Sequence, residues 1–207
     1  MEGRGGEESK EIAVKKADRR ELTRSALIES AAIEFEQHGY AGTVLSNVSD
    51  RLGLTKGTVY FHFPTKALLA GSVIEHYWTA WDDDLEQARQ SPDSLGGLRS
   101  LSRKVAERYR DDVTIRAAVR LMRERNVDVP SNYLPFIGWL NIVEEFLSKA
   151  VDQRELPEGL DVKAYSRQIV ATVDGLQKMA DDLGSRSELP AMVEEMWRVY
   201  GLDEKNT

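Results

Sequence analysis

Cysteine is absent from all 207 residues of the sequence. This absence excludes disulfide bonds, zinc sites with thiolate ligands, iron–sulfur clusters and a cysteine nucleophile, and it is compatible with a reducing compartment. The sequence also has no apolar run near the roughly 20 residues that a membrane-spanning helix requires. Its first residues, Met1–Glu8, lack the apolar core of a signal peptide. Together these absences predict an intracellular, soluble protein.

Histidine is scarce as well, with three instances at His38, His62 and His76. The sequence contains no His-x-x-x-His or Glu-x-x-His metal pair, no glycine-rich phosphate loop and no Gly-x-Ser-x-Gly nucleophile motif. The acidic run Asp82–Asp84 has unsuitable spacing for paired catalytic carboxylates, and we expect it to form a solvated helix face. These features predict a protein that is not an enzyme and that uses no cofactor and no metal.

Charge is distributed unevenly along the chain. The sequence has 28 lysines and arginines against 35 aspartates and glutamates, which gives a net charge of −7. Residues 1–70 hold ten basic and ten acidic residues, so the whole net negative charge lies in residues 71–207. Within the first part, Ala13–Arg24 contains five basic residues against two acidic ones. This run indicates either a solvated arm or a segment that follows a polyanion such as DNA.

Apolar residues recur at helical spacing along most of the chain, and no alternating strand pattern of useful length is present. The length suits one large domain or two small ones. We predict an all-α fold with a disordered tail over residues 1–14, a DNA-binding domain over 15–66 and a larger helical domain over 67–207. About nine helices are expected, near residues 18–37, 45–52, 55–62, 64–85, 94–109, 112–125, 132–151, 162–183 and 187–201. Gly39 is the expected stop signal of the first helix.

The segment Val44–Lys66, VLSNVSDRLGLTKGTVYFHFPTK, predicts two short helices separated by a tight glycine turn. A small apolar seam would hold the two helices at the steep angle of a helix-turn-helix, and it consists of Val48, Leu52, Leu54 and Val59. The second helix then exposes short polar residues, one lysine and aromatic side chains with polar tips. Such a helix can enter the major groove of DNA, where a glycine lets the backbone approach closely.

Residues 20–70 resemble the DNA-binding domain of the tetracycline-repressor (TetR) family, most specifically from Gly53 to Lys66. The resemblance implies a set of DNA-facing residues on the second helix: Thr55, Lys56, Gly57, Thr58, Tyr60 and His62. It implies phosphate contacts for Lys66, and Thr43 and Ser46 would also suit phosphate oxygens. Lys56 can reach a guanine or a phosphate. Phe61 and Phe63 are expected in the core, and the basic arm at Lys15, Lys16, Arg19 and Arg20 is a further candidate for the DNA backbone or minor groove.

The same resemblance implies a C-terminal helical domain that dimerises through its last two long helices and holds a small-molecule pocket. The sequence itself shows wide apolar stripes in the helices over 162–183 and 187–201, including Ile169, Val173, Leu176, Met192, Met196 and Trp197. A homodimer joined by a four-helix bundle would bury both faces of these helices. The alternative is that the two helices pack only on the fourth and seventh helices of their own chain.

A narrower resemblance rests on Ile115–Leu121, on Val129-Pro130 and on Pro135–Trp139. These segments are similar to the γ-butyrolactone autoregulator receptors, which control secondary metabolism and antibiotic production in filamentous actinobacteria. The resemblance implies that Trp139 closes over the lactone. The candidate ligand contacts are Trp139, Tyr77, Tyr109, Tyr165, Gln168 and Gln177. Because polar side chains are mixed into this set, a butenolide, a furan-type hormone or an antibiotic stands beside the acyl lactone as a possible ligand.

These observations predict a repressor in the cytoplasm, associated with the nucleoid, that binds a pseudo-palindromic double-stranded DNA operator as a homodimer. A small signalling molecule would release it and thereby control secondary-metabolite genes. One alternative is a regulator of the same family that senses an antibiotic or another hydrophobic compound. A second alternative, from a different class, is a helical adaptor that does not bind DNA. The adaptor would show no salt-sensitive DNA binding, whereas a repressor loses affinity steeply as salt rises.

Overall fold

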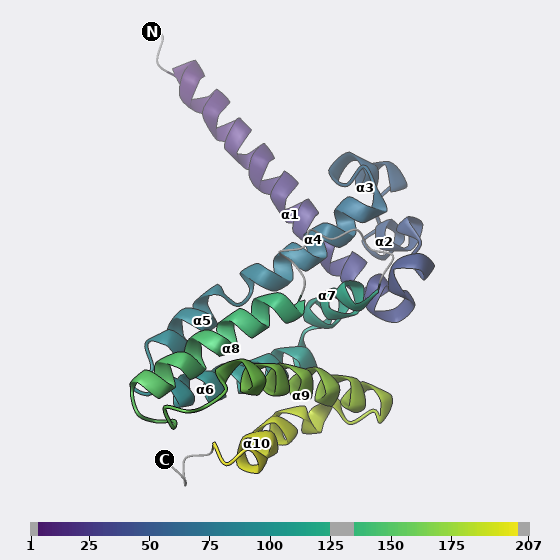
Figure 1. The fold of residues 1–207 in the computed structure, drawn as a ribbon. Helices are drawn as coiled ribbons and strands as arrows, with labels where there is room; N and C mark the ends of the chain where they lie inside the picture. The colour runs from purple at the N-terminus through teal and green to yellow at the C-terminus, as the bar shows by residue number, and fades with distance from the viewer. Residues whose placement is uncertain (1–3, 125–134, 203–207) are drawn as a thin grey trace.

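The computed structural model describes residues 4–124 and 135–202, and every regular element within these ranges is helical (Figure 1). The all-α prediction is therefore confirmed. The elements are α1 (Arg4–Gly42), α2 (Leu45–Arg51), α3 (Lys56–His62), α4 (Lys66–Thr79), α5 (Asp82–Arg89), α6 (Ser94–Asp111), α7 (Val113–Arg123), α8 (Pro135–Asp152), α9 (Val162–Asp182), the 3₁₀ turn η2 (Arg186–Glu188) and α10 (Leu189–Val199). The predicted helix start near Asn132 and the Val129-Pro130 motif lie outside the described residues.

Helix α1 is longer than the sequence pattern predicts. It begins at Arg4, so most of the segment expected as a disordered tail over residues 1–14 is helical. Its N-terminal part projects away from the rest of the molecule (Figure 1). The regular helix is interrupted at Gly39, which has φ 68° and ψ 179°. This left-handed conformation favours glycine because no Cβ is present, and it confirms Gly39 as the stop signal.

The long fourth helix predicted over residues 64–85 is divided into α4 and α5. At the junction the Trp81 amide donates to the carbonyl of Trp78 at 3.3 Å, a three-residue step in place of the helical four. This turn places the Trp81 side chain in the core, where it is 2% exposed. The break between α4 and α5 therefore accompanies the burial of the large Trp81 side chain, and the spacing of apolar residues does not predict this break.

Asp84 contradicts the prediction that residues 82–84 form a solvated face. Its side chain is buried, and its carboxylate lies 2.8 Å from Lys104 Nζ and 2.6 Å from Arg108 Nη2 on the neighbouring helix α6. Hydrogen bonds and the charges of these two cations hold the pKa of the Asp84 carboxyl below its ordinary value against the opposing effect of burial. The aspartate thus joins α5 to α6.

Two packed regions organise the chain. In the first region, α1 packs against α2 and along α4. The fully buried residues of this region include Leu27, Phe35, Val48 and Val59. In the second, α6 lies among α5, α8 and α10, and α8 packs on α9. Helix α7 packs on α1 and α4 of the first region and also contacts α6 of the second, so it joins the two regions. The predicted apolar seam between α2 and α3 is present, with Leu52 and Leu54 half-buried against this core.

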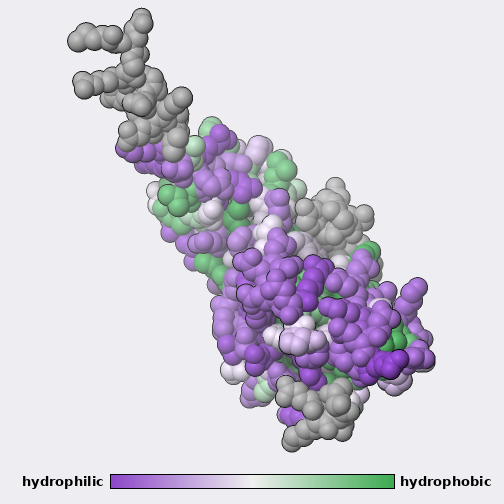
Figure 2. All heavy atoms as spheres, turned by 90° about the vertical axis from the view of Figure 1, so that its left-hand side faces the viewer, coloured by the Kyte–Doolittle hydropathy of each residue, from purple (hydrophilic) through white to green (hydrophobic). Residues whose placement is uncertain are grey.

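The face of the molecule drawn in Figure 2 is mainly hydrophilic. On the face that Figure 2 shows, hydrophobic residues form scattered patches among polar ones. Within the described residues, no helix combines the length and the apolar character needed to span a bilayer.

Candidate nucleic-acid interface and ligand cavity

The turn between α2 and α3 forms as the glycine pattern predicts. Gly53 has φ 64°, and the amides of Gly53 and Leu54 donate to the carbonyls of Asp50 and Ser49 at 3.1 and 2.9 Å. These bonds satisfy carbonyls at the end of α2. Thr55 then begins α3 as its N-cap, since its side-chain oxygen accepts from the Thr58 amide at 3.3 Å.

A buried carboxylate holds α2 on α1. Glu34 is 3% exposed, and its oxygens accept from Arg51 at 2.8 Å and from the Asn47 side-chain amide at 3.2 Å. Ser30, one turn earlier on α1, donates to the carbonyl of Val48 at 2.9 Å. The sequence analysis missed this anchor, because a glutamate at one position of a charged helix carries no signal that it is buried.

One face of α3 is free to meet a partner. Thr55, Lys56, Gly57 and Tyr60 are exposed, and Thr58 and His62 are half-buried. Lys56 Nζ lies 5.7 Å from the centroid of the Tyr60 ring. Among the described residues, a Cβ built at Gly57 would have only Thr55 Oγ1 within 4 Å, at 3.6 Å. Packing within the described chain therefore does not require glycine at this position.

Two of the residues predicted to contact phosphate form hydrogen bonds within the protein. Thr43 is 4% exposed, and its hydroxyl donates to the carbonyl of Gly39 at 2.7 Å. Lys66 Nζ donates to the carbonyls of Thr43 at 3.1 Å and Ala41 at 3.4 Å, and it lies 4.8 Å from the Tyr40 ring centroid. Both side chains satisfy carbonyls near the end of α1. Ser46 is half-buried at the start of α2.

The two phenylalanines of α3 and its exit behave differently. Phe63 is 2% exposed, as predicted, but Phe61 is 66% exposed, so its assignment to the core is wrong. The Arg20 guanidinium lies 5.2 Å from the Phe61 ring centroid. Burial, together with the positive charges of Arg20 and Arg24, lowers the pKa of His62. This end of α3 is therefore flanked by the basic residues of α1, which supports a role for that arm near a polyanion.

A cavity lies where α4 and α7 meet the second packed region, between α4, α6, α7, α8 and α9. Its lining residues are Tyr77, Leu98, Leu101, Ser102, Val105, Val119, Phe136, Trp139, Val143, Ile169, Val170, Val173, Asp174 and Gln177. A mainly apolar wall with few polar groups is typical of small-molecule sites. Three of the six predicted ligand residues, Tyr77, Trp139 and Gln177, are brought together here.

Aromatic rings form one wall of this cavity. The Trp139 indole N–H donates to the Tyr77 hydroxyl at 2.7 Å, and Trp139 packs edge-on against Trp81 with ring centroids 5.5 Å apart. Burial raises the pKa of the Tyr77 hydroxyl, so this group stays protonated. A Cβ at Gly138 would overlap the Trp78 ring. The glycine therefore lets α8 approach α4 closely enough to place Trp139 on the cavity wall.

Three predicted ligand residues lie away from the cavity lining. Tyr109 is buried and donates its hydroxyl to Asp181 at 2.6 Å. Gln168 is exposed, because it lies beside the inward-facing Ile169 on the outer side of α9. Tyr165 is on the inward side but one turn nearer the start of α9, where it is half-buried against the core. Polarity alone therefore did not distinguish cavity residues from their neighbours on the same helices.

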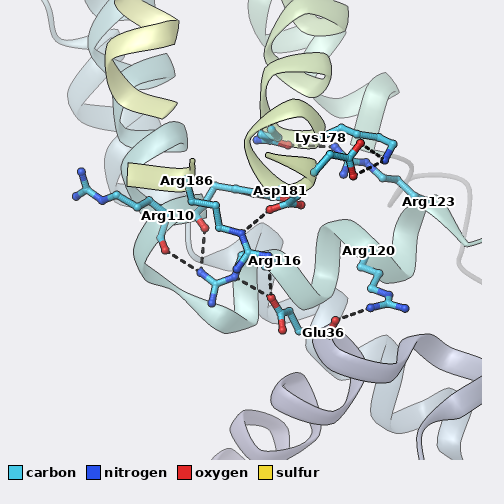
Figure 3. Close-up of polar contacts among 11 residues, drawn as sticks. Glu36, Arg110, Arg116, Arg120, Arg123, Lys178, Asp181 and Arg186 are labelled. Carbon is cyan, nitrogen blue, oxygen red and sulfur yellow. Dashed lines mark hydrogen bonds and ion pairs between the residues drawn. The ribbon is translucent and has the colours of Figure 1, made fainter. Parts of the chain in front are cut away.

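A cluster of ion pairs joins the helix-turn-helix region to the cavity region (Figure 3). Glu36 on α1 accepts from Arg116 of α7 at 3.2 Å and lies 3.2 Å from Arg186 of η2. Arg186 also contacts Asp181 of α9 at 2.5 Å. Arg120 of α7 donates to the Glu36 carbonyl at 2.5 Å. The sequence analysis missed these residues, since they come from four separate elements.

Two family models match the chain. Residues 27–73 match the model described as bacterial regulatory proteins, tetR family, and residues 93–202 match the tetracyclin repressor-like C-terminal domain. The A-factor receptor protein of Streptomyces griseus is 27% identical over 176 residues, which is 85% of this chain but 61% of that receptor's own length.

Solved structures resemble the chain along most of its length. One, described as the molecular basis for control of antibiotic production by a bacterial hormone, is 33% identical with a TM-score of 0.76, covering 86% of this chain and 95% of the other. A crystal structure of an ArpA-like γ-butyrolactone receptor is 29% identical with a TM-score of 0.77, covering 88% and 87%. These matches extend over both packed regions.

Proposed function

The chain belongs to the TetR family of bacterial regulatory proteins, and we propose that it is a ligand-released repressor that binds a pseudo-palindromic operator as a homodimer. The observation that carries the proposal is the combination of two sites in one chain. An exposed α3 face centred on Lys56 lies in one packed region, and an apolar cavity bounded by Trp139 and Tyr77 lies in the other.

On the DNA side, α3 would enter the major groove with Thr55, Lys56, Gly57, Thr58, Tyr60 and His62 toward the bases and backbone. Lys56 supplies the cation of this face, and Ser46 at the start of α2 is a candidate for a phosphate. Two such helices, about 34–36 Å apart in a dimer, would read successive major grooves. Thr43 and Lys66 would support this surface by holding the end of α1 rather than by touching phosphate.

A homodimer through α9 and α10 is part of the proposal. Much of the apolar stripe on these helices is already buried within the chain, where α9 packs on α8 and α10 packs on α6. Exposed apolar side chains still remain at Met179, Leu183 and Val199, which are 42%, 69% and 82% exposed. A twofold contact between these helices would cover apolar surface that a monomer leaves in water.

For the effector, the proposal names a γ-butyrolactone, butenolide or furan-type hormone that controls genes for secondary metabolites. Its support is the mainly apolar cavity lined by Tyr77 and Trp139 and the likeness to a γ-butyrolactone receptor and to a structure concerned with antibiotic production. A ligand would release DNA by binding more tightly to a conformer with a different spacing of the two α3 helices. Sensing of an antibiotic in the same cavity is the second candidate, favoured by the polar groups of Asp174 and Gln177 in the wall.

The experiment is a mobility-shift titration on the DNA upstream of the protein's own gene, with and without an organic extract of the producing culture. The Lys56→Ala variant should bind about 30-fold more weakly, because each subunit of a dimer loses one contact with a free energy of about 1 kcal/mol. Lys149→Ala, which removes an exposed lysine of α8, is the matched control and should bind like the wild type. Unchanged binding by Lys56→Ala would overturn the DNA assignment, and failure of every extract and lactone to release DNA would overturn the sensor assignment.

A further inference from the structure

We infer that Phe61 helps to select the operator sequence, because its phenyl ring contacts the 5-methyl group of a thymine in the major groove. The inference rests on the proposed function, since it names the base chemistry that α3 would recognise. Phe61 was expected in the core, but it is 66% exposed. An apolar ring therefore lies in water on the helix that would enter the groove.

The position of Phe61 around the α3 axis is the first step. Val59 is fully buried and marks the inward side of this helix. Gly57 and Phe61 lie four residues apart and share one face. Each is two residues from Val59, which corresponds to about 200° around a helix of 3.6 residues per turn. Phe61 therefore lies opposite the core, and Gly57, one turn earlier, lets DNA approach the backbone beside the ring.

The surroundings of Phe61 are the second step. The Arg20 guanidinium lies 5.2 Å from the centroid of the Phe61 ring, and the His62 ring is nearly perpendicular to it at 5.3 Å. Lys56 Nζ lies 5.7 Å from the ring centroid of Tyr60, the residue before Phe61. The two cations match the negative charge of DNA phosphates, which arginine and lysine contact. The exposed ring thus lies among groups that favour DNA over an apolar protein partner.

The chemistry of the ring is the third step. A phenyl ring has no hydrogen-bonding atom, so it cannot read the donors and acceptors of the base edges. Its face carries partial negative charge, which makes contact with a phosphate unfavourable. The apolar group that base pairs present in the major groove is the 5-methyl group of thymine, and phenylalanine is a side chain that contacts it. A thymine opposite Phe61 would cover apolar surface that is otherwise in water.

The test compares two forms of the DNA fragment upstream of the protein's own gene, amplified with either thymidine or deoxyuridine triphosphate. Deoxyuridine pairs in the same way but lacks the methyl group. We expect the wild type to bind the thymine form about tenfold more tightly, because a dimer would bury one methyl group in each subunit. Phe61→Ala should reduce this preference below about threefold. Leu68→Ala, which shortens a 55% exposed apolar side chain near the start of α4, is the matched control and should keep the preference.

Salt dependence gives a second, independent measurement. Between about 50 and about 200 mM salt, the affinities for both forms of DNA should fall, because phosphate contacts release counterions. Their ratio should stay constant, since the methyl contact is uncharged. Arg20→Ala should weaken binding to both forms and leave their ratio unchanged, because a phosphate contact carries no sequence information.

Equal binding of the two forms by the wild type would overturn the inference and leave the repressor assignment intact. A preference that Phe61→Ala does not reduce would also overturn it, because another side chain would then read the methyl group. A preference that disappears at the higher salt concentration would contradict an apolar contact. Binding of neither form by the wild type would refute the repressor assignment, and this inference with it, so the two failures are distinguishable.

Discussion

The Glu36 cluster makes a quantitative prediction about how the helix-turn-helix region is held to the cavity region. The perturbation is Glu36→Gln, which keeps the shape of the side chain and removes its charge. Glu36 and Arg116 side chains are 19% and 14% exposed, and Arg186 is 39% exposed. The pairs therefore lie between exposed ion pairs, which contribute about 0–1 kcal/mol, and buried ones, whose disruption costs about 3–5 kcal/mol.

The other contacts of Arg116 and Arg186 limit the loss of stability in this variant. Arg116 still donates to the carbonyls of Tyr109 and Arg110 at 3.0 and 2.9 Å, and Arg186 still contacts Asp181. We therefore expect Glu36→Gln to lower the free energy of unfolding by about 2 kcal/mol. With a urea dependence of about 2 kcal/mol per molar, the unfolding midpoint should fall by about 1 M.

The assay is urea unfolding followed by circular dichroism at one fixed protein concentration, because an oligomer's stability depends on concentration. Glu145→Gln is the matched control, since its pair with Arg89 is about half exposed at 46% and 42%. The free energy of unfolding of this control variant should fall by less than about 0.5 kcal/mol. If the two variants had the same midpoint as the wild type, the reasoning that Glu36 joins the two regions would be refuted.

Two further predictions concern charge and backbone conformation. Lys104 and Arg108 lower the pKa of Asp84 in the folded protein, so its contribution is present at neutral pH and is lost as pH falls through the folded pKa. Asp84→Asn should therefore lower the melting temperature at pH 7, and the difference from wild type should shrink below pH 4; a constant difference from pH 7 to pH 3 would contradict this. Gly39→Ala should destabilise the protein by about 1–3 kcal/mol in the same urea assay, because φ is 68° and the new Cβ would overlap Glu124. Unchanged stability of Gly39→Ala would show that α1 can end without the left-handed turn.

Local rules predicted the helix-turn-helix well, and they did so for short-range reasons. The turn at Gly53 and the cap at Thr55 depend on residues within a few positions of one another, and the seam of Val48 and Val59 spans eleven positions across that turn. Such features can be read directly from spacing and residue type. The exposed position of Lys56 follows from the same helical period.

Predictions about individual polar residues were less successful. Thr43 and Tyr109 were assigned to ligands by residue type and Lys66 by the family resemblance, and each forms hydrogen bonds within the fold that the sequence did not indicate. The predictions for Phe61 and Asp84 were wrong about burial. The Phe61 ring, expected in the core, is exposed, and the Asp84 carboxylate, expected on a solvated face, is buried. A side chain's burial depends on what faces its helix, and sequence periodicity identifies only which residues share a face.

The sequence by itself determined the all-α class, the helix boundaries set by glycine and capping residues, and the exposed face of α3, because these depend on local conformational preferences. The tertiary structure decided which polar groups would be paired. Arg123 of α7 donates to Asp174 and Gln177 of α9, more than 50 positions away in the chain, only because the fold brings these two helices together. Glu36 becomes a link between the two regions for the same reason, since its partners are distant in sequence and are brought together by packing.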